Sequence, residues 1–413
     1  KNKKMAKLFC GPTLDLSDIS TGGGLNPTKL TAPSSSLAVL AVGDELYTLE
    51  IPSLDDFSSP IQDMCSGSGV ETVTYSLPIK VDCLGKASSV EIQSVAHSAS
   101  DSAVIGCIDS HGCANVHRVS PKDNQENVSK RVRVEKELEI NHMKGFPNVR
   151  RCEAGWAGVS FNHDGGRMGV CHGLSRWVGT CDVDSRTMVN TGWTTKPVQD
   201  MCWFNSSILA FAEMEALTLW DSRCEAKTSS FTRCVPNPKG IMHCVSAIND
   251  HVVACAGTDR VVHLIDTRTL RVVKHWRSPC KFDIASLHPS CGDPDVLYLS
   301  GLDNEILTCN TGGTEKSKQR LKRRPKLGTT NNNGSMALDG VEANTEPVAD
   351  PVGEPIGGHG RLHQSHHLGI RGDSRWIGVT TFKAGEEEAV LGVSANGTIN
   401  ILQCPNLANQ ARG

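Results

Sequence analysis

Aromatic residues and long apolar runs are both scarce in this chain. Phe, Trp and Tyr make up only 5% of the 413 residues, so a core must be built from Val, Leu, Ile, Ala and Cys. No run of 18 apolar residues occurs, which predicts that no helix spans a membrane. Lys1–Met5 is basic without an apolar stretch behind it, unlike a secretory signal peptide. The net charge of -3 argues against a protein that coats nucleic acid or anionic membrane with its whole surface.

The short motifs of common catalytic sites are also missing. The chain has no P-loop, no HExxH, no G-x-S-x-G and no strand-to-helix G-x-G-x-x-G. Gly22–Gly24 is a glycine run without the Lys-Ser/Thr that phosphate binding requires. We therefore predict a protein that is not an enzyme and that binds no cofactor.

Cysteine is abundant, but its distribution excludes a disulfide framework. The 17 cysteines are odd in number, scattered from Cys10 to Cys404, and form no CxxC pair. Several lie inside apolar runs, where a free thiol packs as a small hydrophobic group; these include Cys107, Cys202, Cys255 and Cys309. The pattern indicates a reducing compartment, so we expect the nucleus, the cytoplasm or both.

One pattern recurs seven times along the chain. It consists of an apolar run, a turn containing a small, acidic or amide residue, and then alternating apolar positions. The seven copies are Leu37–Ile51, Val104–Val119, Met168–Val183, Ile208–Asp221, Val252–Asp266, Val296–Asn310 and Ala389–Cys404. Each copy predicts a β-hairpin, because Gly, Asp and Asn supply the turn conformations that tight hairpins need.

The spacing of the copies indicates the blades of a propeller. The turns near Ser175, Met214, Asp259 and Asp303 follow one another at steps of 39, 45 and 44 residues. A further short strand precedes several hairpins, which gives three or four strands to each unit. The acids that recur at these turns are expected to form the turns. Five tryptophans are expected to pack between blades, with one or two lining a pocket; these are Trp156, Trp177, Trp193, Trp203 and Trp376.

The chain divides into five segments on this interpretation. Residues 1–35 form an N-terminal arm, in which Lys7–Cys10 is a candidate closing strand beside Thr398–Cys404. Residues 36–310 form six blades, and residues 373–404 form the last blade. The intervening residues 311–372 are predicted to be disordered, with a basic and an acidic half, and residues 405–413 form a tail. Asp55–Pro78 and Ser120–Arg151 are two further insertions that lengthen the repeat.

Several segments resemble the WD40-repeat family. Leu219–Arg223 (LWDSR) is similar to the Trp-Asp ending of a WD40 blade, and Leu264–Arg268 is similar with Ile in place of Trp. Val159–Met168 and Ser286–Ser290 resemble the family's turn between first and second strands. The Gly-His pair that opens the family's repeats is nearly absent. The resemblance implies an all-β, diverged WD40-type propeller of seven blades, with a disordered insertion between the last two.

Two stretches resemble the box by which WD40 substrate receptors bind the adaptor of cullin-RING ubiquitin ligases. They are Ile208–Arg223 and Val253–Arg268. The resemblance implies adaptor docking through Trp220, Asp221, Arg223, Asp266 and Arg268. The box overlaps the general repeat, so structural repetition is an alternative explanation of the match.

Two charged or metal-binding candidates lie in the predicted insertion. Lys316–Lys326 carries seven positive charges in eleven positions, at Lys316, Lys318, Arg320, Lys322, Arg323, Arg324 and Lys326. This run fits a nuclear-import signal, a nucleic-acid phosphate contact or a solubilising loop. Nearby are four histidines, at positions His359, His363, His366 and His367. We predict no metal site there, because a flexible loop without a nearby cysteine is a poor closed site.

The sequence favours a binding scaffold. We expect a protein–protein interaction subunit of a nuclear or nucleocytoplasmic complex, with other proteins as partners and no membrane. Three alternatives remain open: a ubiquitin-ligase substrate receptor, a nucleic-acid-binding accessory protein that uses the basic run, and a propeller hydrolase with acids around the central channel.

Overall fold

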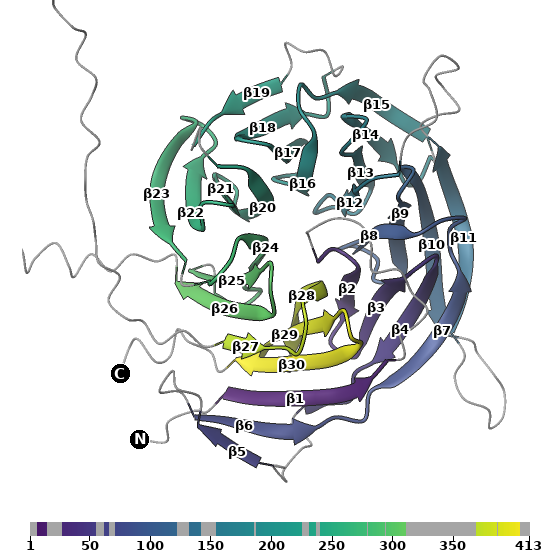
Figure 1. The fold of residues 1–413 in the computed structure, drawn as a ribbon. Coiled ribbons are helices and arrows are strands. Elements are labelled where there is room, and N and C mark those ends of the chain that lie inside the picture. Colours follow the sequence, from purple (N-terminus) through teal and green to yellow (C-terminus); the bar gives the residue numbers. More distant parts are fainter. Residues whose placement is uncertain are drawn as a thin grey trace, which may run out of the picture. The chain divides into compact units, whose positions relative to one another are not determined.

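The protein consists of seven β-sheets arranged in a ring, as Figure 1 shows, and their described strand pairs are antiparallel apart from that of β1 with β6. The computed structural model describes residues 6–14, 27–54, 62–65, 71–121, 132–141, 154–185, 187–224, 231–236, 240–278, 280–293, 295–310, 369–385 and 387–404. No helix in these ranges is long and apolar enough to cross a membrane. The prediction of an all-β, seven-bladed propeller is confirmed.

Six blades have four strands each, which follow one another from the channel outward. The first contains β2 (Leu30–Ser34), β3 (Leu37–Val42), β4 (Glu45–Glu50) and β7 (Lys80–Lys86), and the second contains β8 (Ile92–His97), β9 (Val104–Asp109), β10 (Cys113–Pro121) and β11 (Val132–Asn141). The third contains β12 (Ala157–Phe161), β13 (Arg167–His172), β14 (Trp177–Asp182) and β15 (Thr187–Trp193), and the fourth contains β16 (Val198–Trp203), β17 (Ile208–Glu213), β18 (Ala216–Asp221) and β19 (Phe231–Cys234). The fifth contains β20 (Met242–Asn249), β21 (Val252–Gly257), β22 (Val261–Asp266) and β23 (Arg271–Arg277), and the sixth contains β24 (Ile284–Pro289), β25 (Val296–Gly301), β26 (Glu305–Asn310) and β27 (Gly369–Arg371).

The seventh sheet closes the ring and has six strands. Its order is β28 (Trp376–Ala384), β29 (Glu387–Ser394), β30 (Thr398–Cys404), β1 (Ala6–Thr13), β6 (Glu71–Ser76) and β5 (Gln62–Cys65). β1 pairs antiparallel with β30, with Lys7 opposite Gln403. On its other side β1 pairs parallel with β6. The N-terminal strand is therefore an interior strand of this sheet, held between the C-terminal strand and a hairpin that leaves the first blade.

The seven predicted hairpins correspond to the second and third strands of the seven blades. Acids at their turns accept backbone hydrogen bonds, as expected from their recurrence. Asp109 Oδ1 accepts from the N–H groups of His111 and Cys113 at 3.0 and 2.9 Å. Asp259 Oδ1 accepts from the N–H of Val261 at 3.0 Å. These carboxylates fix the turns by satisfying N–H groups that the ladder leaves free.

Several segment boundaries differ from those expected. The innermost strand of the first blade, β2, lies within residues 1–35. Outer strands β11 and β27 lie in Ser120–Arg151 and Thr311–Gly372, both expected to be insertions. Asp55–Pro78 contributes β5 and β6 to the seventh sheet. The remainder of residues 311–372, up to residue 368, lies outside the described residues.

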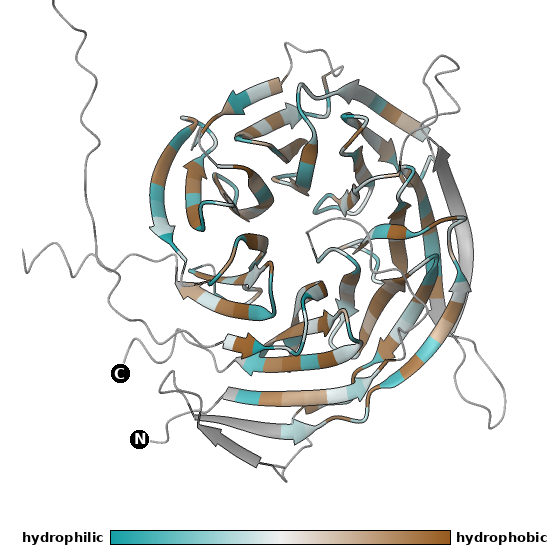
Figure 2. Cartoon of the chain, in the orientation of Figure 1, coloured by the Kyte–Doolittle hydropathy of each residue, from teal (hydrophilic) through white to brown (hydrophobic). Residues whose placement is uncertain are grey.

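Apolar side chains fill the spaces between neighbouring blades. Val39, Ala41 and Leu46 of the first blade pack with Ile92 and Ile105 of the second, all five of them buried. Figure 2 shows hydrophobic stretches on strands all around the ring. Because each blade buries one face against the next, the packed core runs around the ring, and the inner strands are left to line an axial channel.

Candidate functional site: the turn face and the central channel

One face of the ring carries the turns between second and third strands, and we call it the turn face. In the fourth blade this turn is Met214–Glu215. Register places the first residue of β16, Val198, opposite Glu213, and the last residue of β19, Cys234, opposite Leu217. The connections that enter and leave each blade therefore lie on the same face as these turns.

The turn face of blades three to six exposes large hydrophobic side chains. Seven such side chains are exposed among the described residues. Four belong to turns or blade connections of this face, namely Leu174, Val235, Ile241 and Phe282, and a fifth, Trp193, is the last residue of β15, where a connection of this face begins. The other two, Val189 and Val273, lie within the outer strands β15 and β23. Because burial of exposed apolar side chains drives protein association, this face is a candidate binding surface.

Polar side chains brace the connections that carry this surface. Arg176 and Arg260 occupy the left-handed backbone region at their turns, with φ of 58° and 56°. The Arg176 guanidinium donates to the Thr195 carbonyl at 3.1 Å, and that of Arg260 to the Lys281 carbonyl at 3.0 Å. The Lys281 ammonium also lies 5.1 Å from the centre of the Phe282 ring. The exposed aromatic side chains of Trp193 and Phe282 therefore lie beside or on connections that are hydrogen-bonded to the turns.

Glu213 fixes the connection held by Arg176 a second time, from inside. Its carboxylate is buried and accepts hydrogen bonds from the Thr195 hydroxyl, the Lys196 N–H at 2.6 Å and the Thr218 hydroxyl at 2.6 Å. Thr195 and Lys196 belong to the connection that follows Trp193. A charged acceptor with several donors is a strong constraint, because each hydrogen bond to a charged group is worth about 1.5–3 kcal/mol.

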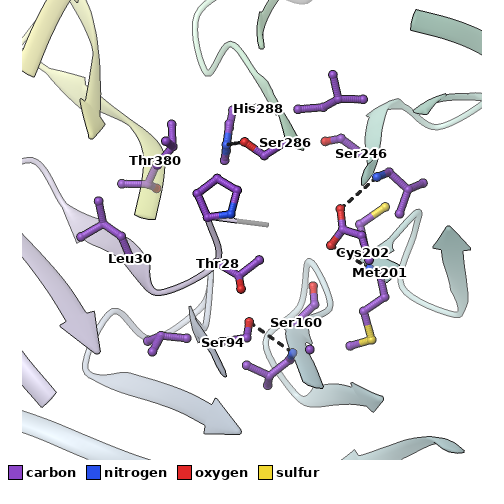
Figure 3. Close-up of a pocket in the computed structure, with 18 of the residues that line it drawn as sticks. Thr28, Leu30, Ser94, Ser160, Met201, Cys202, Ser246, Ser286, His288 and Thr380 are labelled. Atoms are coloured by element: carbon purple, nitrogen blue, oxygen red, sulfur yellow. Dashed lines mark hydrogen bonds between the residues drawn. The ribbon is translucent and has the colours of Figure 1, made fainter. Parts of the chain in front are cut away.

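A cavity of about 250 Å³ occupies the central channel, lined by the innermost strands or adjoining residues of all seven blades. Around it the labelled residues of Figure 3 follow one another in chain order, from Thr28 and Ser94 to Thr380. Most of the polar groups are small hydroxyls: Thr28, Ser94, Ser160, Ser246, Ser286 and Thr380. Asp200 is the one carboxylate among the described residues that line the cavity.

A β-bulge recurs where the first and second strands of five blades pair. The register shifts at Ile92/Ser94, Val198/Asp200, Met242/Cys244, Ile284/Ser286 and Trp376/Gly378. A bulge re-aims the side chain that follows it. Ser94, Asp200 and Ser286, at equivalent positions after the bulge, all line the channel.

Asp200, Cys202 and His288 are ionisable lining residues with strongly shifted pKa values, and burial raises that of the Cys202 thiol. Burial raises the pKa of Asp200 to about 7, although hydrogen bonds from the Val245 and Met201 N–H groups, both 2.9 Å, act in the opposite direction. Burial lowers the pKa of His288 to about 4, so its ring is neutral near pH 7. His288 Nε2 lies 2.7 Å from the Ser286 hydroxyl. A propeller hydrolase was expected to place several acids here, and the described lining supplies Asp200 alone.

The residues predicted for adaptor docking lie at the ends of two third strands. Trp220 is fully buried and packs between the rings of Phe211 and Phe231, at 6.5 and 5.8 Å. Asp221 pairs with Arg223, and their closest charged atoms are 2.6 Å apart.

Asp266 and Arg268 repeat this pair in the next blade, at 3.2 Å. The two arginine side chains are 67% and 65% exposed. The structure thus brings each acid and arginine together within its own turn, and an adaptor would reach the arginines but not the buried Trp220.

The remaining sequence candidates divide between buried residues and residues outside the described ranges. Trp177, Trp203 and Trp376 are buried, as expected of packing tryptophans, while Trp156 lines the channel and Trp193 is exposed. Lys316–Lys326 and the four histidines lie outside the described residues. The described residues contain no group of three metal-ligating side chains.

Sequence reasoning did not single out Asp200 or Phe282, and its expectation that Trp193 packs between blades or lines a pocket is wrong, because this side chain is exposed. The bulge that turns residue 200 into the channel leaves no signature in the sequence, since β16 reads as an ordinary strand. Trp193 ends an outer strand, and its exposure depends on how far the neighbouring connection covers it. The one available signal was an acid, Asp200, in a strand whose counterparts carry small or hydroxyl residues.

Comparison with known proteins supports the architecture. No family model and no curated protein matches the chain. Among solved structures, a chain of the structure described as "Crystal Structure of Mitotic Checkpoint Complex" matches with a TM-score of 0.58 and 12% sequence identity. The match covers 98% of this chain and 94% of that one. At this identity the likeness is one of fold alone, and it agrees with the closed ring of seven sheets in showing that the chain is a seven-bladed β-propeller.

Proposed function

We propose that this propeller is an interaction scaffold, a subunit that holds other proteins together in a nuclear or nucleocytoplasmic complex. The observation that carries the proposal is the concentration of exposed hydrophobic side chains on the turn face of blades three to six. Trp193 and Phe282 are 48% exposed each; Trp193 ends β15 directly before a braced connection, and Phe282 lies on one. Exposed aromatic residues on a rigid support are typical centres of protein interfaces, because little conformational entropy is lost when they bind.

Two further features fit a scaffold role. The described lining of the channel supplies a single carboxylate, and the basic run at Lys316–Lys326 fits a nuclear-import signal. A checkpoint complex contains the solved chain of similar fold, which shows that this fold is used in a multiprotein assembly. We therefore infer that binding, and not catalysis, is the activity of this protein.

The test is affinity purification from nuclear and cytoplasmic fractions with matched surface variants. Trp193→Ser combined with Phe282→Ser removes two aromatic groups from the turn face. Val273→Ser removes a side chain of similar exposure, 57%, from the outer strand β23. We expect partners of the wild-type protein to be lost with the double variant and retained with Val273→Ser. Identical partner sets from the wild type and double variant would contradict the proposal.

A second candidate is a substrate receptor of a cullin-RING ligase. It is favoured by the equivalent acid–arginine pairs of Asp221 with Arg223 and Asp266 with Arg268 in adjacent blades, both arginines being exposed. Arg223→Ala with Arg268→Ala should then abolish co-precipitation of the ligase adaptor. The turn-face double variant is the control, because it should still bind the adaptor. An adaptor that never co-precipitates with the wild type would exclude this candidate.

A further inference from the structure

The channel carboxylate has a structural role that a neutral side chain also performs. Asp200 Oδ2 accepts a hydrogen bond from the Val245 N–H of the next blade, at 2.9 Å. At the equivalent position two blades earlier, Ser94 Oγ accepts from the Val159 N–H of its next blade, at 3.5 Å. Both contacts satisfy an N–H of an innermost strand that has no further strand to pair with. Since a hydroxyl is sufficient at position 94, joining the blades does not explain a charge at position 200.

No cation in the described lining balances that charge. The cavity lining contains neither Lys nor Arg, and its histidine, His288, is neutral near pH 7. Three thiols lie near Asp200, those of Cys171, Cys202 and Cys244. Burial, and to a lesser degree the charge of Asp200, raises their pKa values well above neutrality, so they stay protonated. A partly buried acid without a counter-charge is costly, and binding of a cation beside it would offset that cost.

The dimensions of the cavity favour a small ligand. Its volume of about 250 Å³ lies below the range of roughly 300–1,000 Å³ typical of sites for drug-sized molecules. One unbranched chain with a charged end is of the right size. Thr28, Ser94, Ser160 and Ser246 place hydroxyl oxygens around the same space, and these can accept hydrogen bonds from an ammonium or guanidinium group.

Asp200 lies nearer to the turn face than to the opposite face of the ring. Asp200 pairs with Ala212, two residues before the Met214–Glu215 turn, so the carboxylate lies near the mouth on that side. The exposed side chains of Trp193 and Phe282 lie on the same face. A protein bound to this surface would therefore have its chain close to the channel mouth.

We propose that the channel binds one organic cation, an alkylammonium or alkylguanidinium group, against the Asp200 carboxylate through its turn-face mouth. The source of this cation rests on the proposed function: it is a lysine or arginine side chain of the protein that the scaffold binds. A free alkylamine has the same chemistry and would occupy the same site.

The test uses small probes on the full chain. Binding of n-butylguanidinium and n-butylammonium is measured by calorimetry at pH 8, with uncharged n-butylurea as the matched probe. Asp200→Ser reproduces the residue found at position 94, and Val273→Ser, on the outer strand β23 and outside the cavity lining, is the control. We expect both cations to bind the wild type and Val273→Ser alike and to bind Asp200→Ser at least tenfold more weakly, and we expect n-butylurea to bind none of the three proteins.

Two results would overturn the proposal. One is a cation affinity that is the same for the wild type and Asp200→Ser, and the other is an absence of cation binding to the wild type. Asp200→Asn serves as a second uncharged variant in case the serine variant does not fold. The peptide acetyl-Gly-Gly-Arg-Gly-Gly-amide distinguishes the sources. Tighter binding of the peptide than of n-butylguanidinium indicates a partner's side chain, and equal or weaker binding indicates a free amine.

Failure of cation binding can be separated from failure of the scaffold proposal. Trp193→Ser with Phe282→Ser should leave n-butylguanidinium binding unchanged, because neither side chain lines the cavity. Loss of partners in that variant therefore tests the turn face alone, and loss of cation binding in Asp200→Ser tests the channel alone.

Discussion

The rings of Phe9 and Tyr75 stack with their centroids 5.1 Å apart and their planes inclined by 26°. The two residues are opposite each other in the parallel pairing of β1 with β6, and Phe9 is fully buried. Tyr75 belongs to a hairpin that leaves the first blade, whereas Phe9 pairs with Ile401 of the C-terminal strand on its other side. This contact therefore secures the closure of the ring by segments from both ends of the chain.

Replacing Phe9 by Ala should destabilise the protein strongly. A buried Phe→Ala change costs about 3–5 kcal/mol, because apolar contacts are lost and a cavity remains. The free energy of unfolding, measured by denaturant titration, should fall by that amount, and deletion of residues 1–12 should lower the melting temperature clearly. Val273→Ala, on an exposed outer strand, should change stability by less than about 0.5 kcal/mol. An unchanged stability for Phe9→Ala would show that β1 is dispensable for closure.

Glu388 should couple the sixth and seventh blades. Its carboxylate accepts hydrogen bonds from the Ser290 hydroxyl, the Cys291 N–H and the Tyr298 hydroxyl, the last at 3.0 Å. Glu388→Gln should cost about 1–3 kcal/mol, since it replaces a charged acceptor by an amide. A double-mutant cycle with Tyr298→Phe should give a coupling energy of about 0.5–3 kcal/mol. Strictly additive effects would mean that the Tyr298 contact contributes nothing.

Asp200 should make stability depend on pH between about 4 and 7. Because burial raises its folded-state pKa to about 7, the folded protein holds this proton more tightly than the unfolded chain does. The protonated Asp200 therefore contributes to the free energy of unfolding, and this contribution is fully present below the pKa that Asp200 has in the unfolded chain. It is lost as the pH rises to 7, and the loss is at most about 4 kcal/mol. Carboxylates with lowered pKa values, such as Asp101 and Asp221, act in the opposite direction.

The measurement is therefore a comparison between variants. Unfolding free energies of the wild type and Asp200→Ser are determined at pH 5 and pH 8. The wild type should lose more stability than the variant over this interval, because Ser has no proton to release. Equal losses would indicate that Asp200 ionises at its ordinary pKa in the folded protein.

The basic run should direct the protein to the nucleus. Changing Lys322, Arg323 and Arg324 to Ala should shift a fluorescent fusion from nucleus to cytoplasm, because import receptors read clustered positive charge. The melting temperature should stay unchanged, because a substitution in a segment that the sequence predicts to be disordered rarely changes the free energy of unfolding by more than about 0.5 kcal/mol. A wild-type fusion that is cytoplasmic from the outset would contradict the import signal.

The sequence was sufficient to predict the strands that are buried on both faces. Strands such as β3 and β21 are continuous apolar runs, and their tight turns carry Gly or Asp, so all seven central hairpins could be recognised. Outer strands were harder, because one face is exposed and their apolar content is low. β23 alternates between exposed and partly buried residues, and the three-residue β27 is too short to show any period.

Long-range pairing and local register limited the prediction of the site. Nothing in Glu71–Ser76 indicates that it pairs with β1 and not with its own blade, since alternation predicts a strand but not its neighbour. Asp200 lines the channel because a one-residue bulge after Val198 changes the direction of its side chain, and the sequence does not indicate this bulge. The closing strand differs in this respect: Lys7–Cys10 was expected beside Thr398–Cys404 because closure needs an apolar strand from the other end of the chain, and β1 lies there.

The position of β1 between β30 and β6 has a consequence for amide hydrogen exchange. Residues near a chain terminus usually exchange fast, because the ends fray without disturbing the remainder of the domain. Lys7 to Cys10, in contrast, are paired with a neighbouring strand on each side, one antiparallel and one parallel. The N–H groups among them that pair with β30 can exchange only when the closing strands separate, so protection factors at these few residues report the free energy of ring opening.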